Sequence, residues 1–483
     1  MTPSTGITGA MPTTDLPDHV RVAVLGGGSA AERLAGLLAG EGVAVAVVER
    51  HLVGGECPYY ACIPSKVMLL TAAARTAIGR AHDIGAADAP LDRGDGAEAY
   101  RIAAGRRDDA AADHDDADHV RSLRDKGVHV IRGEGRVCEP GRLAVDTGED
   151  SHELRYDELV LATGSTVVVP DIPGLAEAEP WTFVEAWTAT ERPASMLVIG
   201  GGAVGCEIAQ AHARFGTSVT LVEGEELMGG GVEPETAEDL VALLRADGVD
   251  VRTHAEVSGV DAAGQGWRAT LADGGTVTVE RIVVATGKRP VVDGLGLEHL
   301  GLDPDDLADG HLTIDDACRV VDADHLWAIG DVAGIEPFTH TANYQGWVTA
   351  QNLLGRPTTA DHSGIPRTVY TAPELAAVGM TRAEAEEAGH DVVHVVFDLA
   401  DTARGSVDPA DAGRLVLVAD RSSRLLLGAS LLAPAAGESI SEFALAIRAE
   451  IGVDLLAELV HPFPTWSEGF GYALHRLRKA VGA

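Results

Sequence analysis

The chain has 483 residues, 46% of them hydrophobic and 23% charged, which is typical of a soluble globular protein of about three domains. Its formal net charge of −37 argues against binding to nucleic acid or an anionic membrane, because an acidic surface repels both polyanions. The N-terminal segment lacks the basic and apolar regions of a signal peptide, and no apolar run reaches about 18 residues. We therefore expect a cytoplasmic protein with no membrane span, in which residues 1–18 form a disordered leader.

Two segments of the chain repeat one strand–glycine–helix–strand pattern. The first starts with VRVAVLGGG and ends in a strand closed by Glu49, and the second starts with MLVIGGG and ends in a strand closed by Glu223. The offset from Gly28 to Gly202 is 174 residues, and so is the offset from Glu49 to Glu223. A chance glycine cluster would not carry its acidic residue in register. The repeat therefore predicts two βαβ dinucleotide sites on one chain.

In the first repeat, Gly26, Gly28 and Ala31 fit the G-x-G-x-x-G/A pattern. The first glycine makes the tight turn, the second lets the backbone approach a pyrophosphate, and the small third residue lets helix and strand pack closely. The phosphates are then expected at the helix N-terminus, with Glu49 on the ribose hydroxyls. Taken alone, the motif is also compatible with a simple glycine-rich turn.

The second repeat carries the full pattern in Gly200, Gly202 and Gly205. Glu223 at the end of its second strand favours NADH over NADPH. A carboxylate accepts a hydrogen bond from a free 2′-hydroxyl and repels a 2′-phosphate, for which an Arg is the usual partner.

Two further regions differ in texture from the repeats. The polar stretch Ala86–Asp118 carries helix-forming residues with little apolar periodicity, which predicts an exposed helical excursion. From about Thr358 onward, strand-like runs at 414–418 and 425–432 alternate with helix-like ones such as 438–450. This alternation predicts a separate α+β domain at the C-terminus.

The segment GGECPYYACIPSK contains a close cysteine pair, Cys57 and Cys62, ahead of an apolar helix-like run. Two cysteines at this spacing can close a small disulfide loop. A thiol at a helix N-terminus has a depressed pKa, which populates the thiolate needed for exchange. The alternatives are a pair of buried, inert cysteines, or a metal site, which needs more ligands than the pair supplies. We predict no metal.

This segment resembles the G-G-x-C-x-x-x-x-C-x-P-S-K signature of the class I pyridine nucleotide–disulfide oxidoreductases, and the resemblance runs from about residue 20 to 475. Further matching motifs are the two Ala-Thr-Gly turns that end at Gly164 and Gly287, the AIGDV segment with Asp331, and Pro373-Glu374 followed by Val378-Gly379.

The resemblance implies an α/β fold with two Rossmann-like dinucleotide-binding domains and a C-terminal α+β dimerisation domain. It places an FAD-binding domain at residues 19–163 and 290–357, an NAD(H)-binding domain at 164–289, and the dimerisation domain at 358–483. It also implies FAD and NADH as cofactors, a disulfide or other small molecule as substrate, and a homodimer whose active site is completed across the interface.

The resemblance further assigns roles to single residues. Cys57 is expected to be the interchange thiol that attacks the substrate disulfide, and Cys62 the charge-transfer thiol beside the flavin. Lys66 and Glu207 are expected to form an ion pair near flavin N5, although an ordinary salt bridge is the plainer interpretation. Asp331 is expected to bind the ribityl chain of the flavin.

The sequence departs from the family at the C-terminal motif H-x-H-P-T-x-S-E, which here reads HPFPTWSE. The position of the catalytic His is Phe463, while the Glu that orients it remains as Glu468. A phenyl ring carries no proton, and a positioned acid/base is typically worth roughly 10²–10⁴-fold. His461 is one candidate substitute, because in an extended segment it faces the same side as Phe463.

A second interpretation of Phe463 is that the substrate is not a simple disulfide. Phe463, Tyr59 and Tyr60 are then expected to line an apolar pocket for an aromatic molecule, with core packing as the plainer alternative. Two functions follow. Electrons pass from NADH through FAD to the Cys57–Cys62 disulfide and an unidentified acceptor, or the flavin reacts directly with a quinone, O₂ or an aromatic molecule.

Overall fold

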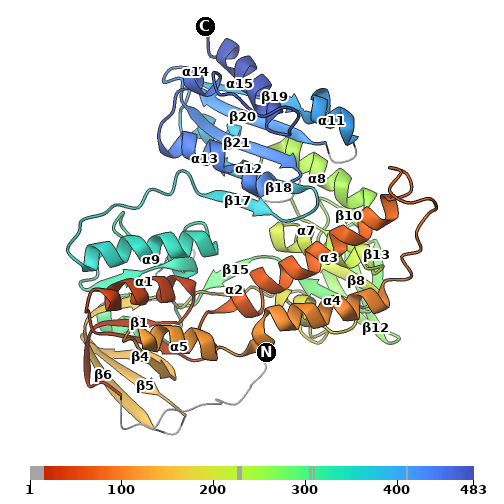
Figure 1. Cartoon of the computed structure of the whole chain (residues 1–483). Helices are drawn as coiled ribbons and strands as arrows, with labels where there is room; N and C mark the ends of the chain where they lie inside the picture. Colours follow the sequence, from red (N-terminus) through yellow and green to blue (C-terminus); the bar gives the residue numbers. More distant parts are fainter. Residues whose placement is uncertain are drawn as a thin grey trace. The chain divides into compact units, whose positions relative to one another are not determined.

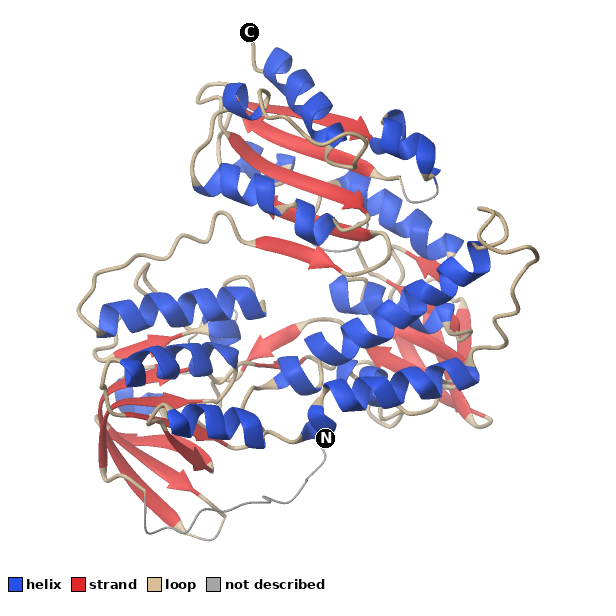
Figure 2. Cartoon of the chain, viewed as in Figure 1, coloured by secondary structure: helices blue, strands red, loops and turns tan. Residues whose placement is uncertain are grey.

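The computed structural model describes residues 16–148, 150–225, 231–303, 307, 310–409 and 412–482 (Figures 1 and 2). Its internal contacts divide the chain into two compact units. The first comprises Met1–Ile63, Asp108–Val167 and Lys288–His362, and the second Pro64–Arg107, Val168–Gly287 and Ser363–Ala483. The three domain boundaries drawn from the sequence remain a prediction.

The first unit is built on a seven-stranded sheet of order β3-β2-β1-β6-β5-β4, with β16 also pairing with β6. The pairs from β3 to β6 are parallel, as is β16 with β6, whereas β4, β5 and β6 form an antiparallel meander. All five residues of β2 are buried, as expected for a parallel strand covered on both faces. The strands are β1 (His19–Leu25), β2 (Val45–Glu49), β3 (His129–Arg132), β4 (Glu134–Glu139), β5 (Arg142–Asp146), β6 (Ser151–Leu161) and β16 (Leu326–Ala328).

Helices α1 (Ser29–Gly40) and α9 (Thr339–Leu353) lie side by side over this sheet (Figure 1). They can approach closely because Gly346 has no side chain. A Cβ at this position would stand 2.7 Å from the carbonyl oxygen of Ala30. The unit also contains α2 (Glu56–Tyr59), α5 (Ala117–Asp125), the 3₁₀ turns η2 (Ala112–His114), η3 (Leu297–Leu300) and η6 (Gly330–Ala333), and the ribbon of β7 (Ser165–Val167) with β15 (Lys288–Pro290).

The second unit contains a four-stranded parallel sheet of order β10-β9-β8-β14 and a three-stranded meander. The strands of the two sheets are β8 (Ser195–Ile199), β9 (Ser218–Val222), β10 (Asp250–Arg252), β14 (Arg281–Val284), β11 (Val257–Ala263), β12 (Gly266–Leu271) and β13 (Thr276–Val279). The helices are α4 (Ala97–Ala110), α6 (Phe183–Thr188), α7 (Ala203–Arg214) and α8 (Pro234–Ala246), together with α3 (Cys62–Arg80), which begins in the first unit.

The C-terminal part of the second unit is an antiparallel sheet of order β17-β18-β21-β20-β19, covered by helices (Figure 2). Its core joins the inner face of the sheet to Phe443 of α13 and Phe470 of α15, so the predicted α+β texture is confirmed. The elements are β17 (Pro366–Val369), β18 (Glu374–Gly379), β19 (Val392–Asp398), β20 (Arg414–Asp420), β21 (Leu426–Ala433), α10 (Arg382–Glu387), η7 (Leu399–Asp401), α11 (Ala403–Val407), α12 (Ala436–Ser439), α13 (Ser441–Arg448), α14 (Val453–Leu456) and α15 (Glu468–Ala480).

The prediction for Ala86–Asp118 is wrong in part. Helix α4 begins only at Ala97, and it is not exposed all round. Tyr100 packs edge-on against Phe215, with ring centroids 5.2 Å apart, and the neighbouring turns bury Ala103, Ala104 and Arg107. The buried stripe has helical spacing, but it includes Arg107 while Ile102 is 58% exposed, so apolar periodicity does not reveal it.

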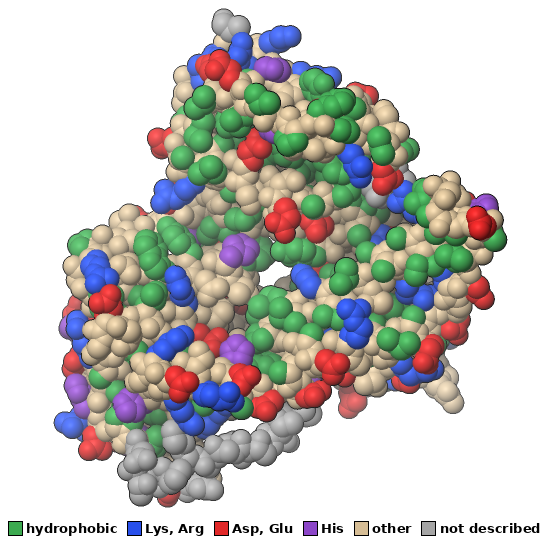
Figure 3. Space-filling view, viewed as in Figure 1, with side chains coloured by type: hydrophobic (Ala, Val, Ile, Leu, Met, Phe, Trp, Pro, Cys, Tyr) green, Lys and Arg blue, Asp and Glu red, His purple; other side chains and the backbone are tan. Residues whose placement is uncertain are grey.

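Acidic side chains are scattered over several elements on the face drawn in Figure 3, with basic ones among them. The segment Glu56–Arg80 has the length and composition of a membrane-spanning helix. One such helix is weak evidence for a membrane, because core helices of soluble proteins can have the same length and composition.

We expect Gly205→Ala to lower the thermal stability of the protein. A Cβ at Gly205 would stand 2.0 Å from the backbone oxygen of Gly200, which cannot move without opening the turn. Such overpacking costs about 1–3 kcal/mol. Gly202→Ala is the matched control, because a Cβ there meets nothing within 4 Å. Thermal unfolding of both variants measures the difference, and equal melting temperatures would contradict the steric argument.

Candidate active site

The turn between β1 and α1 is shaped by two glycines. Gly26 has a φ of +97°, and a Cβ there would stand 2.2 Å from the carbonyl oxygen of Ala162. Gly28 is the N-cap of α1, and a Cβ there would meet nothing within 4 Å. The buried Ala31 follows in the first turn of α1. The helix N-terminus is thus an open cradle, where backbone N–H groups and the helix dipole favour a phosphate.

The turn between β8 and α7 repeats this geometry. Gly200 has a φ of +106°, and a Cβ there would stand 2.4 Å from the carbonyl oxygen of Ala285. Gly202 caps α7 with open space around it. The two N-caps have nearly the same backbone angles, −72° and −177° at Gly28 and −69° and −176° at Gly202. The repeat seen in the sequence is therefore also a repeat in structure.

Glu49 at the end of β2 is fixed by two backbone donors. Its carboxylate accepts the N–H of Gly27 at 2.6 Å and the N–H of His51 at 2.6 Å. Glu223 is held in the same way, because its carboxylate accepts the N–H groups of Gly201 and Glu225. Each oxygen takes one N–H and keeps further lone pairs for a ribose hydroxyl. The carboxylates thus also stabilise the glycine turns by hydrogen bonds, a role that the sequence analysis does not predict.

The glycines that precede the cysteine pair pack on the first glycine turn. The N–H of Gly54 donates to the oxygen of Gly27 at 2.8 Å, and a Cβ at Gly55 would stand 3.0 Å from the Cα of Gly28. Both Gly54 and Gly55 have positive φ. Helix α2 begins immediately afterwards, with Cys57 as its second residue. The glycine pair of the signature therefore fixes the thiols beside the phosphate cradle.

Cys57 and Cys62 are close but not bonded to one another. The sulfur of Cys62, at the start of α3, lies 3.5 Å from the hydroxyl of Thr339, at the start of α9. The hydrogen bond with Cys62 and then burial raise the pKa of the Cys57 thiol, so the predicted depressed pKa is wrong for this cysteine. Helix α2 has only four residues, too few for a strong dipole, and the paired thiols titrate as a unit.

Lys66 and Glu207 form the predicted ion pair. The Lys66 ammonium lies 3.0 and 3.3 Å from the two carboxylate oxygens, and the Glu207 side chain is 7% exposed. Two contacts of Tyr370, which the sequence analysis missed, complete the group. Its N–H donates to Glu207 at 2.9 Å, and its ring centroid lies 4.1 Å from the Lys66 nitrogen. The position of Tyr370 just before the Pro373-Glu374 motif was the available signal.

The remaining predicted residues lie at strand ends. Asp331, in η6 after β16, accepts a 2.5 Å hydrogen bond from the Ser165 hydroxyl, and Gly330 before it has a φ of +78°. Gly164 and Gly287 have φ of +71° and +112°, and each ends an Ala-Thr-Gly turn. The Gly164 carbonyl accepts the N–H of Val291 at 3.0 Å, and the Gly287 carbonyl accepts the N–H of Val168 at 3.1 Å.

The C-terminal motif has a different geometry from the one expected. His461 is 9% exposed in its side chain, whereas Phe463 is 74% exposed, so the expectation that both face one side is wrong. The segment is not an extended strand, and the imidazole instead turns inward to Glu442, with nitrogen–oxygen distances of 3.1 and 3.2 Å. At Glu468, one carboxylate oxygen accepts from the Tyr472 hydroxyl at 3.3 Å. Its other oxygen is buried with no hydrogen-bond partner among the described residues.

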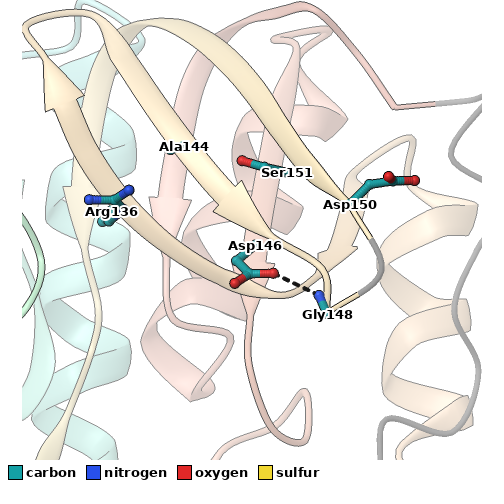
Figure 4. A pocket seen from close by; sticks show the side chains of 6 residues that line it. All are labelled: Arg136, Ala144, Asp146, Gly148, Asp150 and Ser151. Atoms are coloured by element: carbon teal, nitrogen blue, oxygen red, sulfur yellow. Dashed lines mark hydrogen bonds between the residues drawn. The ribbon is translucent and has the colours of Figure 1, made fainter.

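The predicted apolar pocket is not supported at Tyr59. This side chain is 1% exposed, and its hydroxyl donates to the oxygen of Val53 at 2.8 Å, so it belongs to the core. A polar pocket lies elsewhere, on the β4–β5–β6 meander, where Gly148 donates to Asp146 at 2.8 Å (Figure 4). Its lining contains none of the predicted site residues. Among the described residues, no group of three or more His, Cys, Asp and Glu is arranged to hold a metal.

Comparison with known proteins matches nearly the whole chain. The family model of pyridine nucleotide-disulphide oxidoreductases matches residues 20–351, and the model of their dimerisation domain matches residues 365–474. A dihydrolipoyl dehydrogenase of Halobacterium salinarum is 31% identical over 96% of this chain and 99% of its own. A mercuric reductase of Streptomyces lividans is 32% identical over 94% and 95% of the two chains.

Two solved structures share the fold along their whole length. The HOCl-induced flavoprotein disulfide reductase RclA of Escherichia coli has a TM-score of 0.83 and 25% identity, over 96% of this chain and 100% of that one. LpdA of Mycobacterium tuberculosis has a TM-score of 0.83 and 26% identity, over 95% and 100%.

We expect Lys66→Met to destabilise the protein by leaving the Glu207 carboxylate buried with the Tyr370 N–H as its donor. Removing one partner of a buried pair is costly because the other charge stays desolvated. Adding Glu207→Gln to the Lys66→Met variant should recover much of the loss, because it removes that charge. Thermal unfolding of the single and double variants tests this, and a double variant less stable than Lys66→Met would contradict it.

Proposed function

Because this chain belongs to the pyridine nucleotide–disulfide oxidoreductase family, we propose that it passes electrons from NADH through FAD to the Cys57–Cys62 pair and on to a disulfide acceptor. Membership of the family makes the protein a flavin-dependent oxidoreductase that uses FAD and a pyridine nucleotide, with a dimerisation domain at its C-terminus. The choice of NADH, the part played by the thiol pair and the nature of the acceptor are the content of the proposal.

The observation that carries the proposal is the packing of the cysteine segment on the nucleotide turn. Gly54 and Gly55 touch the turn that ends in Gly28, so the thiols start one short helix away from the phosphate cradle. The Cys62 sulfur also lies 3.5 Å from the Thr339 hydroxyl at the start of α9. A thiol pair without a redox role would not need attachment to a dinucleotide turn.

The residues present fit the two cofactors. The open N-terminus of α1, with Gly26, Gly28 and Ala31, is suited to the FAD diphosphate, Glu49 to its ribose and Asp331 to its ribityl chain. When bound, FAD supplies two-electron transfer between a nicotinamide and a thiol pair. Lys66, held by Glu207 and the Tyr370 ring, supplies a fixed positive charge on α3, four residues after Cys62.

Glu223 supports NADH as the reductant. Its carboxylate is fixed at the end of β9 by two backbone N–H groups, beside the open N-terminus of α7 that suits the NADH diphosphate. A fixed negative charge at this point repels a 2′-phosphate and accepts from a 2′-hydroxyl.

The exposed apolar side chains of the C-terminal domain support a homodimer whose active site is completed across the interface. Val460 is 95% exposed and Phe463 is 74% exposed, and Leu445 is 62% exposed. Large apolar side chains at such exposure are typical of an interface that a partner covers. Glu468, which the family resemblance assigns to orienting an imidazole, has one buried oxygen without a hydrogen-bond partner among the described residues. We also propose that the protein is cytoplasmic.

A second function is favoured by Phe463. Without an acid/base at this position, and with a raised pKa at Cys57, thiol exchange is less assisted than direct electron transfer from the flavin. In that case the acceptor is a quinone, O₂ or an aromatic molecule, and the thiol pair is secondary.

We expect Cys57→Ser to abolish disulfide reduction, because the serine hydroxyl cannot attack a disulfide under these conditions. Reduction of bound FAD by NADH should continue, as followed by anaerobic absorbance. Cys138→Ser is the matched control, since Cys138 lies on β4 and hydrogen-bonds to the oxygen of Arg142. Undiminished turnover of every acceptor by Cys57→Ser would instead establish the flavin-direct function.

We expect Phe463→His to raise the reduction of lipoamide or another small disulfide by roughly tenfold or more, the low end of what a positioned acid/base supplies. The Phe463 side chain is exposed, so an imidazole fits at this position without repacking the core. Phe463→Leu controls for the loss of the ring. Steady-state kinetics measures both variants, and no gain in Phe463→His would mean that the rest of the pocket has been rebuilt as well.

A further inference from the structure

Three successive residues before α5 have a strained backbone. Ala112, Asp113 and His114 have φ of +50°, +49° and +61°. This left-handed region costs residues with a side chain about 1–2 kcal/mol each, and it is usually kept where the surrounding structure gains from it. We call residues 112–116 the strap. It packs against α2, the short helix that carries Cys57.

The end of the strap is fixed at Asp116, which is 8% exposed. Its carboxylate accepts the N–H of Val53 at 2.7 Å and also binds the guanidinium of Arg132. The carbonyl of Val53 in turn accepts the hydroxyl of Tyr59 on α2 at 2.8 Å. The backbone of one residue therefore ties the strap to the cysteine-bearing helix. The strain is held in place by this attachment.

The strained backbone places the His114 imidazole on the loop between the two cysteines. Its Nε2 lies 3.2 Å from the carbonyl oxygen of Tyr59, and its ring stacks on Tyr60 with centroids 4.9 Å apart and planes at 28°. A carbonyl can only accept, so Nε2 carries the hydrogen and the neutral ring keeps Nδ1 as a proton acceptor. Across the described residues, this Nδ1 has no hydrogen-bond partner.

His114 therefore holds an acid/base group on the short segment that joins the two cysteines. Tyr59 and Tyr60 lie between Cys57 and Cys62 in the chain, and Tyr60 directly follows α2, on which Cys57 is the second residue. The fixed tautomer and the stacked ring are the features by which a catalytic imidazole is usually oriented.

We propose that His114 is the acid/base group that serves Cys57 in place of the imidazole missing at Phe463, with Tyr60 as a positioning residue. The proposal rests on the disulfide reductase function given above. As Cys57 attacks one sulfur of the substrate, its proton passes to Nδ1 of His114, the substrate S–S bond breaks and a Cys57–substrate disulfide forms. His114 returns that proton to the leaving thiolate.

The second half of the reaction closes the balance. Cys62 attacks the Cys57 sulfur, forming the Cys57–Cys62 disulfide and releasing the second substrate thiolate. The Cys62 proton reaches that thiolate by the same imidazole. Two protein thiols and one substrate disulfide thus become one protein disulfide and two substrate thiols, with two electrons passed to the substrate.

The test compares two disulfides on the holoenzyme reduced by NADH. Hydroxyethyl disulfide releases a basic aliphatic thiolate that needs a proton, whereas an aromatic nitrobenzoate disulfide releases a thiolate that is stable without one. The variant His114→Gln keeps an N–H for the Tyr59 carbonyl but cannot exchange a proton. We expect it to reduce hydroxyethyl disulfide about 10²-fold more slowly. The nitrobenzoate disulfide should be slowed less, because its reduction needs the imidazole only for the attack of Cys57 and not for the leaving thiolate. Added imidazole should restore part of the aliphatic rate in His114→Ala.

Two control variants separate the imidazole from its surroundings. His119→Gln, five residues on, alters a ring that contacts Tyr59 and binds Glu32, and should leave both rates unchanged. Tyr60→Phe keeps the stacked ring and should behave as wild type, whereas Tyr60→Leu should slow the aliphatic disulfide selectively. Equal loss on both disulfides in His114→Gln, or Tyr60→Phe as damaging as His114→Gln, would overturn the proposal.

The result for Cys57→Ser distinguishes a failure of the His114 proposal from a failure of the proposed disulfide reductase function. If Cys57→Ser loses both disulfide activities while His114→Gln keeps both, the reductase function stands and the role of His114 is overturned. If Cys57→Ser keeps both activities, the thiol pathway itself fails.

Discussion

A Cβ at Gly55 would stand 3.0 Å from the Cα of Gly28, and the N–H of Gly54 donates to the oxygen of Gly27. The backbone of the glycine turn at Gly27 and Gly28 is therefore in direct contact with the backbone of Gly54 and Gly55. The first segment turns the chain from β1 into the open N-terminus of α1, and the second starts the helix that carries Cys57. Because neither segment has a side chain to hold them apart, the thiols are brought to the edge of a dinucleotide site. The position of the cysteine segment on the first sheet depends on this contact.

The carboxylates at the strand ends also serve two purposes at once. Glu49 and Glu223 each use backbone N–H groups to hold a glycine turn in shape while keeping acceptor capacity for a ribose. The ion pair of Lys66 and Glu207 is held in a comparable way, by a backbone N–H and the ring of Tyr370. Each of these carboxylates is thereby given hydrogen-bond donors in place of the water that folding removes from it.

The glycine turns and the strand-end carboxylates thus hold the proposed electron path in place, whereas the C-terminal motif lacks the imidazole that the family resemblance places there. At the C-terminus, Phe463 is exposed, His461 is turned inward to Glu442, and a Glu468 oxygen is left without a partner. At the strap, an imidazole is held against the loop between the cysteines at the expense of strained backbone. The proposal for His114 accounts for both features. The imidazole is missing at Phe463, and another imidazole is held at His114 by a strained backbone.

The sequence by itself determined the features that depend on local spacing. The two βαβ repeats, the cysteine signature and the family follow from residue types at fixed intervals, because glycine turns and helix starts impose those intervals on any chain that makes them. The C-terminal α+β texture was equally predictable, since alternating strand and helix patterns reflect one buried face each.

The tertiary structure decided everything that depends on which way a side chain turns. Tyr59 and Tyr60 are neighbours in sequence, yet one hydroxyl is buried against Val53 while the other ring meets His114. His461 turns to Glu442 because its segment is irregular, and helix α4 buries Arg107 while it exposes Ile102. Contacts such as Lys66 with Tyr370 join residues that are hundreds of positions apart. No local pattern encodes such meetings, because they arise only when separately folded segments pack.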